Sequence, residues 1–274
     1  MVYSEDFSSI DMKSIGSSNE KLPAIGVGTK GIQDFKVAEE ALSYAFNLGL
    51  KLVEVSDSYG EGLAQELVGR VIKKFKRDEI FVVLRIDSIK FSDAESAVKA
   101  VSNSLHRMGV SYVDVVISAG LNEIAGLSMQ IKSLEVLIDK GLTRYIGLGD
   151  LKLGELKKAI ELTSKHNISF LQYKYSIINK RIEKDVMQLA TKNNIAVLAC
   201  SPLEKGAVKS HPKLVNIAAK YNKTPVQVAI NYLISRPCVI ATPKSERKYH
   251  IDEIYGALGW KLSIEDIKYL GGTI

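Results

Sequence analysis

Residues 97–117 read AVKAVSNSLHRMGVSYVDVVI and combine two structural patterns in one stretch. The first part carries apolar residues at helical spacing, and the last part, Tyr112–Ile117, is a short β-branched run that is typical of a buried strand. Gly109 separates the two, at a position where the end of a helix needs left-handed backbone geometry. The stretch therefore predicts a helix that is followed directly by a buried strand.

The same pattern recurs along the whole chain. Helix-like stretches alternate with apolar runs, and the runs start about 25 to 32 residues apart until the last interval. That interval is longer because two predicted helices, 212–222 and 225–235, fill it. The eight predicted strands are Ala24–Gly28, Lys51–Val55, Ile80–Ile86, Tyr112–Ile117, Thr143–Leu148, Ser169–Tyr173, Ile195–Ala199 and Cys238–Ala241.

Eight alternating strand–helix units predict an α/β protein that folds as a (β/α)8 TIM barrel. An open doubly wound sheet is the alternative, but its GxGxxG turn is missing after the first strand, where Gly26-Val27-Gly28 is followed by Thr-Lys-Gly. Residues 1–20 contain turn-forming residues at 16–19 and predict an N-terminal hairpin before the barrel. The whole chain, 1–274, is predicted to be a single barrel domain.

Composition narrows the class of protein further. The 274 residues are 46% hydrophobic and 25% charged, which excludes a disordered chain, a collagen and a coiled coil. The net charge of +6 permits contact with phosphates but does not indicate a nucleic-acid partner. A basic run at 73–77 falls where a helix should end, and we interpret it as a solvated face.

The cysteines and the N-terminus bear on the cellular setting. Cys200 and Cys238 lie far apart, without the spacing of a metal site or a disulfide framework, so no metal is predicted. Met1–Ile10 lacks the apolar core of a signal peptide, and no run approaches the roughly 18 apolar residues that span a bilayer. We expect a cytoplasmic protein with reduced thiols and no membrane partner; the sequence leaves the oligomeric state open.

In a barrel of this kind, functional residues follow the carboxyl ends of the strands. Three segments at such positions together resemble the aldo-keto reductases: Leu22–Thr29, Ser58-Tyr59-Gly60 and Pro243-Lys244-Ser245. Weaker matches, such as Thr224–Ala229, extend the resemblance from about residue 20 to 256. The resemblance implies a barrel that reduces aldehydes or ketones with NADPH, which it binds without a Rossmann fold.

The resemblance also implies a set of catalytic residues. Tyr59 matches the family's proton donor, Glu54 takes the place of its Asp, and Arg85 takes the place of its Lys. We expect Arg85, paired with Glu54, to lower the pKa of Tyr59 by favouring the phenolate. The family's His falls on Ala119, and the loss of one such donor typically costs on the order of 10²–10³ in rate. The catalytic residues thus predict a slow or altered reductase.

The cofactor site implied by the resemblance is partly retained. Lys244 and Ser245 match the residues that bind the adenosine 2′-phosphate in the family. The family's Arg falls on His250, so Arg247 is expected to supply the charge. The family's early Trp falls on Lys30, and its stacking Tyr falls on Cys200. The predicted cofactor-binding residues are Gly28, Thr29, Asp150, Gln172, Ser201, Leu203, Lys244, Ser245, Arg247, His250 and Glu253.

Three functions remain open from the sequence. The first is an NADPH-dependent reductase of a small carbonyl substrate; since Lys30 and Arg85 replace Trp and Lys, its mouth should favour an anionic ligand over an apolar aldehyde. The second is a barrel that binds NADP or another phosphorylated ligand without turnover. The third is a lyase or isomerase of a phosphorylated sugar that uses Glu54 or Asp57 as a base. The sequence does not identify the substrate.

Overall fold

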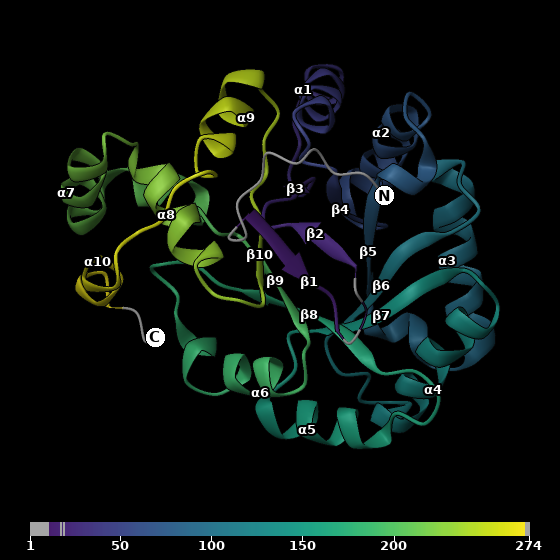
Figure 1. Ribbon diagram of the computed structural model, residues 1–274. Coiled ribbons are helices and arrows are strands. Elements are labelled where there is room, and N and C mark those ends of the chain that lie inside the picture. Colours follow the sequence, from purple (N-terminus) through teal and green to yellow (C-terminus); the bar gives the residue numbers. More distant parts are fainter. Residues whose placement is uncertain (1–10, 17, 19, 272–274) are drawn as a thin grey trace.

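The computed structural model describes residues 11–16, 18 and 20–271. Eight parallel strands follow one another in chain order around a barrel, with helices on its outside (Figure 1). The predicted (β/α)8 fold is therefore confirmed. The strands are β3 (Val27–Gly28), β4 (Leu52–Ser56), β5 (Phe81–Asp87), β6 (Val113–Ala119), β7 (Thr143–Gly149), β8 (Ile168–Lys174), β9 (Ala196–Cys200) and β10 (Val239–Thr242).

The barrel closes where β3 meets the segment around β10. Isolated parallel bridges join Ile25 to Ala241 and Gly28 to Lys244. A Cβ atom at Gly28 would lie only 2.9 Å from the carbonyl oxygen of Thr242, so the backbones approach closely there because residue 28 has no side chain. This closure brings Lys244, from the end of the chain, beside the first strand.

Helices wrap the barrel, and local signals set their ends. The Asp93 side chain accepts from the backbone N–H of Ser96 at the start of α3, and Gly109 ends that helix with a φ of 67°, as predicted. Within the described residues, no helix has the length and apolarity needed to span a membrane. The α-helices are α1 (Phe35–Asn47), α2 (Leu63–Ile72), α3 (Ala94–Met108), α4 (Gly126–Asp139), α5 (Leu153–Leu162), α6 (Val186–Lys192), α7 (Pro212–Tyr221), α8 (Pro225–Ile234), α9 (Lys248–Tyr255) and α10 (Ile264–Tyr269).

Short 3-10 helices occupy several of the connections between these elements. Among the residues discussed below, Tyr59 lies on η2 and Lys209 lies on η6. The 3-10 helices are η2 (Tyr59–Gly62), η3 (Arg77–Glu79), η4 (Ser88–Phe91), η5 (Arg181–Lys184) and η6 (Glu204–Ser210).

A hairpin precedes the barrel and fills one of its ends. β1 (Met12–Ser14) pairs antiparallel with β2 (Lys21–Pro23), which confirms a hairpin but carries its second strand past the predicted limit of residue 20. Residues 1–10 of the predicted hairpin segment lie outside the described residues. Ile15 and Leu22 pack into the inner core of the barrel, near the beginning of its strands. The hairpin therefore covers the amino end of the inner core.

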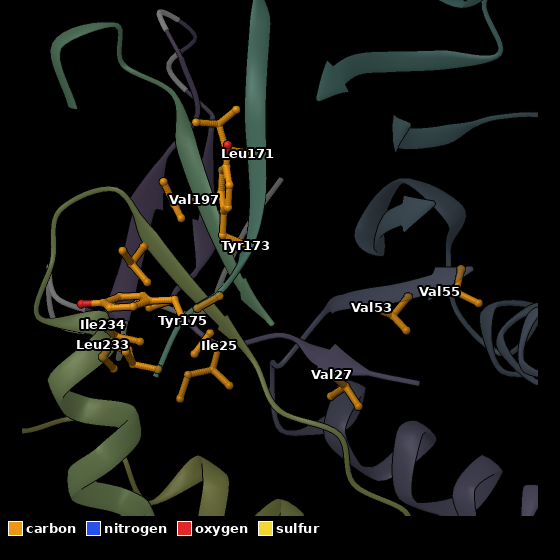
Figure 2. Packing of buried hydrophobic residues seen from close by; sticks show 14 of the residues in the cluster. Ile25, Val27, Val53, Val55, Leu171, Tyr173, Tyr175, Val197, Leu233 and Ile234 are labelled. Carbon is orange, nitrogen blue, oxygen red and sulfur yellow. The ribbon is translucent and has the colours of Figure 1, made fainter. Parts of the chain in front are cut away.

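Alternation along the strands separates an outer core from an inner one. Val53 and Val55 point outward into the layer between strands and helices, as do Leu171 and Tyr173 of β8 (Figure 2). Leu52 points inward instead, into an apolar cluster. On each of four strands, the residue two positions after an inward apolar residue has a side chain that can form hydrogen bonds. These residues are Glu54, Arg85, Gln172 and Cys200.

Candidate active site

A cavity of about 270 Å³ opens at the carboxyl end of the strands. We call it the mouth cavity. Its lining residues come from the loop after β3 and from the ends of β4, β5 and β6: Lys30, Ser56, Ser58, Tyr59, Arg85, Asp87 and Ala119. Tyr59, Arg85 and Ala119 were expected here, and Lys30 lies at the mouth as predicted.

A larger hollow, of about 460 Å³, lies on the outside of the barrel between α2 and α3. Its lining residues are exposed helical side chains: Glu66, Asn103, His106 and Arg107. His106, on α3, therefore belongs to this outer surface. The mouth cavity is the better candidate for chemistry, because it lies at the strand ends and is lined by a phenol that is hydrogen bonded to a buried acid.

Tyr59 stands directly after β4 and points at the carboxylate of Glu54. Its hydroxyl donates to Glu54 Oε1 over 3.0 Å, and the Nε2 group of Gln172 donates to the same oxygen over 3.1 Å. Gly60 has a φ of 58°, and a Cβ atom there would lie 2.8 Å from the ring of Phe35. The Tyr-Gly pair is thus needed for the turn that presents the phenol.

Arg85 does not pair with Glu54, so that prediction is wrong. Its Nη2 forms an ion pair with Asp150 Oδ2 over 2.7 Å, and its Nη1 donates to Gln172 Oε1 over 2.7 Å. Gly149 leaves room for this arrangement, since a Cβ atom there would lie 3.1 Å from Nη1. The forked guanidinium thus binds one acceptor from β8 and one after the end of β7, and it shares Gln172 with Glu54 as a hydrogen-bond partner.

The pKa values of Tyr59 and Glu54 also differ from the prediction. Burial, and after it the charge of Glu54, raise the pKa of Tyr59, and the opposing charge of Arg85 does not reverse the shift. Burial also raises the pKa of the Glu54 carboxyl, which is 4% exposed, against the hydrogen bonds from Gln172 and Tyr59. At neutral pH the phenol therefore keeps its proton, and without a bound ligand it is a weaker acid than the prediction requires.

Two hydroxyl groups in the mouth cavity were given no role by the sequence analysis, which named Ser58 only as part of the Tyr59 motif. The Oγ atoms of Ser56 and Ser58 lie 3.0 Å apart at the end of β4. Their place within three residues of Tyr59 was the available signal, but serines at a strand end are common and point to no particular chemistry. They are hydrogen-bonding groups close to a cavity wall where Ala119 offers none.

Cys200 and Lys30 complete the surroundings of Tyr59. Burial raises the pKa of the Cys200 thiol to about 12, and the charges of Glu54 and Asp150 act in the same direction. The thiol is therefore protonated and not a nucleophile. The ammonium of Lys30 is 6.0 Å from the centre of the Tyr59 ring, where it adds positive charge to the mouth.

A second group of cations gathers beyond the closure of the barrel. Burial lowers the pKa of His250, and the positive charges of Lys209, Arg247 and Lys244 lower it further. We call these four residues the basic cluster. Lys209, on η6, was missed by the sequence analysis, because no motif marks it and only folding brings it close. Such a set of cations is suited to hold a phosphate.

Two details describe how the basic cluster is held. Arg247 is the N-cap of α9, which begins at Lys248, and the Arg247 carbonyl accepts from the N–H of His250 over 3.0 Å. The Ser245 hydroxyl is engaged within the turn, where it donates to the Arg247 carbonyl over 3.1 Å and accepts from the Arg247 N–H over 3.2 Å. Lys244 is paired with Glu246. The ammonium of Lys244 therefore already has a carboxylate partner.

The remaining predicted cofactor residues take up several places around the mouth. The Thr29 hydroxyl donates to the backbone carbonyl of Glu54 over 2.9 Å and so supports β4. Ser201 and Leu203 lie in the loop between β9 and η6, with Ser201 at a φ of 53°. Glu253 lies on α9, and its charge raises the pKa of His250. The roles of these residues in cofactor binding stay predictions.

Comparisons with known proteins identify the family. The sequence profile of the aldo/keto reductase family matches residues 24–273, and the chain belongs to this family. It is 26% identical to the aldo-keto reductase yakc of Schizosaccharomyces pombe, and the match covers 95% of this chain and 90% of that protein. The name of that relative includes NADP(+). It is 25% identical to the methylglyoxal reductase YeaE of Escherichia coli, covering 93% of this chain and 92% of that protein.

Solved structures agree with the fold. A thermostable aldo-keto reductase in complex with the inhibitor epalrestat superposes with a TM-score of 0.89 at 29% identity, covering 94% of this chain and 98% of that one. An aldo/keto reductase from Klebsiella pneumoniae, in complex with NADP and acetate, has a TM-score of 0.88 at 24% identity, covering 95% of this chain and 94% of that one. The barrel is thus that of the family.

Proposed function

We propose that this chain is an NADPH-dependent reductase that converts an aldehyde or ketone to an alcohol, with Tyr59 as the proton donor. The observation that carries the proposal is the Tyr59 hydroxyl in the mouth cavity, 3.0 Å from the buried carboxyl of Glu54. A phenol at the carboxyl end of the strands is where a carbonyl oxygen must be met by a proton. Family membership supports the same reaction class.

The residues present fit a nicotinamide dinucleotide with a 2′-phosphate at one end. The charges of Lys209, Lys244 and Arg247 all act on His250, and this set of cations suits a phosphate dianion. The NADP(+) in the name of the yakc relative supports the same cofactor. When bound, the cofactor supplies the hydride that reduces the carbonyl carbon. Asp150 and Gln172 are the candidates for its amide, but both are already bonded to Arg85.

Proton transfer falls to the chain's own residues. The Tyr59 hydroxyl breaks its O–H bond and protonates the alkoxide oxygen as that oxygen forms. Arg85 is the cation whose charge favours the phenolate left behind. Glu54 holds a carboxyl with a raised pKa within hydrogen-bond distance of the same oxygen, so it is placed to return a proton to Tyr59.

The mouth favours a substrate that carries a negative group. Lys30 adds an exposed ammonium near the Tyr59 ring, and no described carboxylate lies within ion-pair distance of it. Asp87 also lines the cavity, but its carboxylate accepts from the backbone N–H of Ile89. We therefore expect carbonyl compounds with a carboxylate or phosphate to be reduced faster than apolar aldehydes of the same size. Because Cys200 and Cys238 are free thiols, we propose a cytoplasmic location.

The first experiment is a fluorescence titration of the protein with NADPH and with NADH, followed by NADPH consumption across a panel of neutral and anionic carbonyls. We expect saturable binding of NADPH and turnover that depends on Tyr59. A protein that binds no cofactor, or turnover that is the same in Tyr59→Phe, would contradict the proposal.

A second candidate is a barrel that binds NADP or another phosphorylated ligand without turnover. The observation that favours it is the pairing of Arg85 with Asp150 and Gln172, because among the described contacts no hydrogen bond or ion pair joins the guanidinium to Glu54. Ala119 adds no donor for a carbonyl oxygen. Tight NADPH binding with no consumption on any carbonyl would support this candidate.

A further inference from the structure

Glu246 connects the two chain segments that meet where the barrel closes. Its carboxylate accepts hydrogen bonds from the backbone N–H groups of Gln33 and Asp34, over 3.0 and 2.9 Å. It also forms an ion pair with Lys244. Gln33 and Asp34 precede Glu246 by 213 and 212 positions and lie just before α1, so this contact exists only in the folded barrel.

The Glu246 side chain is held as an anion. It is 16% exposed, and this burial raises its pKa, but the N–H of Asp34, the ammonium of Lys244 and the N–H of Gln33 together bring the pKa below its usual value. At neutral pH a negative charge therefore lies against Lys244, the residue that the family motif assigns to the 2′-phosphate.

The other cations of the basic cluster are not neutralised in this way. In the part of the chain that the structure describes, neither Lys209 nor Arg247 forms an ion pair with a carboxylate. A phosphate that binds Lys244 must replace or share Glu246 as its partner, and two anions at one ammonium repel each other. Glu246 thus opposes the binding of a 2′-phosphate while the rest of the cluster favours it.

We propose that Glu246 is a specificity-determining residue that weakens the preference of this site for NADPH over NADH by competing for Lys244. The inference rests on the proposed function, because it takes Lys244 as a partner of the 2′-phosphate. NADH has no 2′-phosphate and does not compete for the ammonium, so its binding is insensitive to the charge at residue 246.

The test is the substitution Glu246→Gln, which removes the charge and keeps an oxygen that can accept from Gln33 and Asp34. In fluorescence titrations we expect the Kd for NADPH to fall about fivefold to tenfold, and that for NADH to change less than about twofold. Glu79→Gln is the control, because Glu79 pairs with Lys51 elsewhere on the surface. It should change neither Kd.

A second readout isolates the phosphate. Calorimetric titration with adenosine 2′,5′-bisphosphate, compared with adenosine 5′-monophosphate, measures the same preference without a nicotinamide. Glu246→Ser removes the charge with a smaller side chain and must shift the preference in the same direction, so the test does not depend on one variant folding well.

The outcomes separate this inference from the proposed function. Equal tightening for NADPH and NADH, or no change in either, overturns the role of Glu246 and leaves the reductase proposal intact. No NADPH binding by the parent or by Glu246→Gln overturns both. Binding that is selective for NADPH and stronger in both charge-removing variants supports the inference.

Discussion

The mouth cavity and the basic cluster lie on the same side of the barrel, yet they use their charges differently. In the mouth, Arg85 is bonded to Asp150 and Gln172, while Glu54 accepts from Tyr59 and Gln172. In the basic cluster, several cations surround His250, and only Lys244 has a carboxylate partner among the described contacts. Charges that bind one another hold a structure, whereas charges without a partner are available to a ligand.

This difference separates the binding of a cofactor from turnover of a substrate. A site rich in unpaired cations can hold a phosphate with little rearrangement. A site whose polar groups satisfy one another must exchange some of these bonds before it can act on a substrate. We therefore expect a phosphorylated cofactor to bind with little change in the basic cluster, whereas turnover requires hydrogen bonds in the mouth cavity to be exchanged.

The largest expected effect belongs to Tyr59→Phe, which removes the phenolic oxygen from the mouth cavity. We expect kcat to fall by about 10²–10⁴, the usual contribution of a positioned proton donor. Tyr112→Phe is the control, because Tyr112 precedes β6 at the other end of the barrel. If Tyr59→Phe keeps the kcat of the parent, Tyr59 is not the proton donor, and the mouth cavity only binds a ligand.

A second substitution should increase the rate. Ala119 lines the mouth cavity, and Ala119→His places a ring N–H donor where a carbonyl oxygen is expected. The expected gain in kcat is about 10²-fold, the inverse of what the loss of such a donor costs. Ala119→Phe fills similar space without the donor, and an equal gain in both variants would mean that packing, not hydrogen bonding, limits the rate.

Lys244→Met probes the basic cluster instead of the mouth. Losing one charge-assisted contact to a phosphate should raise the Kd for NADPH about tenfold and leave that for NADH nearly unchanged. Lys99→Met, on the exposed side of α3, is the matched control in the fluorescence titration. Equal weakening for both cofactors would mean that Lys244 supports the fold rather than the phosphate.

The smallest effect concerns stability. Burial raises the pKa of Glu54, so the folded protein favours the neutral carboxyl. The contribution of Glu54 to the free energy of unfolding is therefore highest at low pH, and it decreases as the pH rises through the raised pKa of the folded protein. Glu54→Gln has no such loss, and at neutral pH its free energy of unfolding should exceed that of the parent by about 0.5–2 kcal/mol, at a cost in activity.

Urea unfolding at acidic and neutral pH measures the difference in free energy of unfolding between Glu54→Gln and the parent. We expect this difference to grow as the pH rises. Glu79→Gln should behave in the opposite way. Its ion pair with Lys51 lowers the pKa of Glu79, so the parent gains stability above the usual carboxyl range and loses it as the pH falls. A gap for Glu54→Gln that is independent of pH would show that its carboxyl is not perturbed in the folded protein.

Local patterns in the sequence determined the barrel, the place of Tyr59 after β4 and the place of Lys244 after β10. Apolar runs with alternating faces define strands, and Gly109 marks a helix end whatever lies elsewhere in the chain. The motif around Lys244 is equally local, because the residues that carry it are consecutive.

Only the tertiary structure decided the partners of the charged side chains. Arg85 binds Asp150 across 65 positions of the chain, and Glu246 binds the amides before α1 across more than three times that separation. Burial, which raises the pKa of Tyr59, likewise depends on every strand around it. The physical reason is range: backbone propensity acts over a few residues, whereas ion pairs and desolvation depend on which distant side chains the closed barrel brings within a few ångströms of one another.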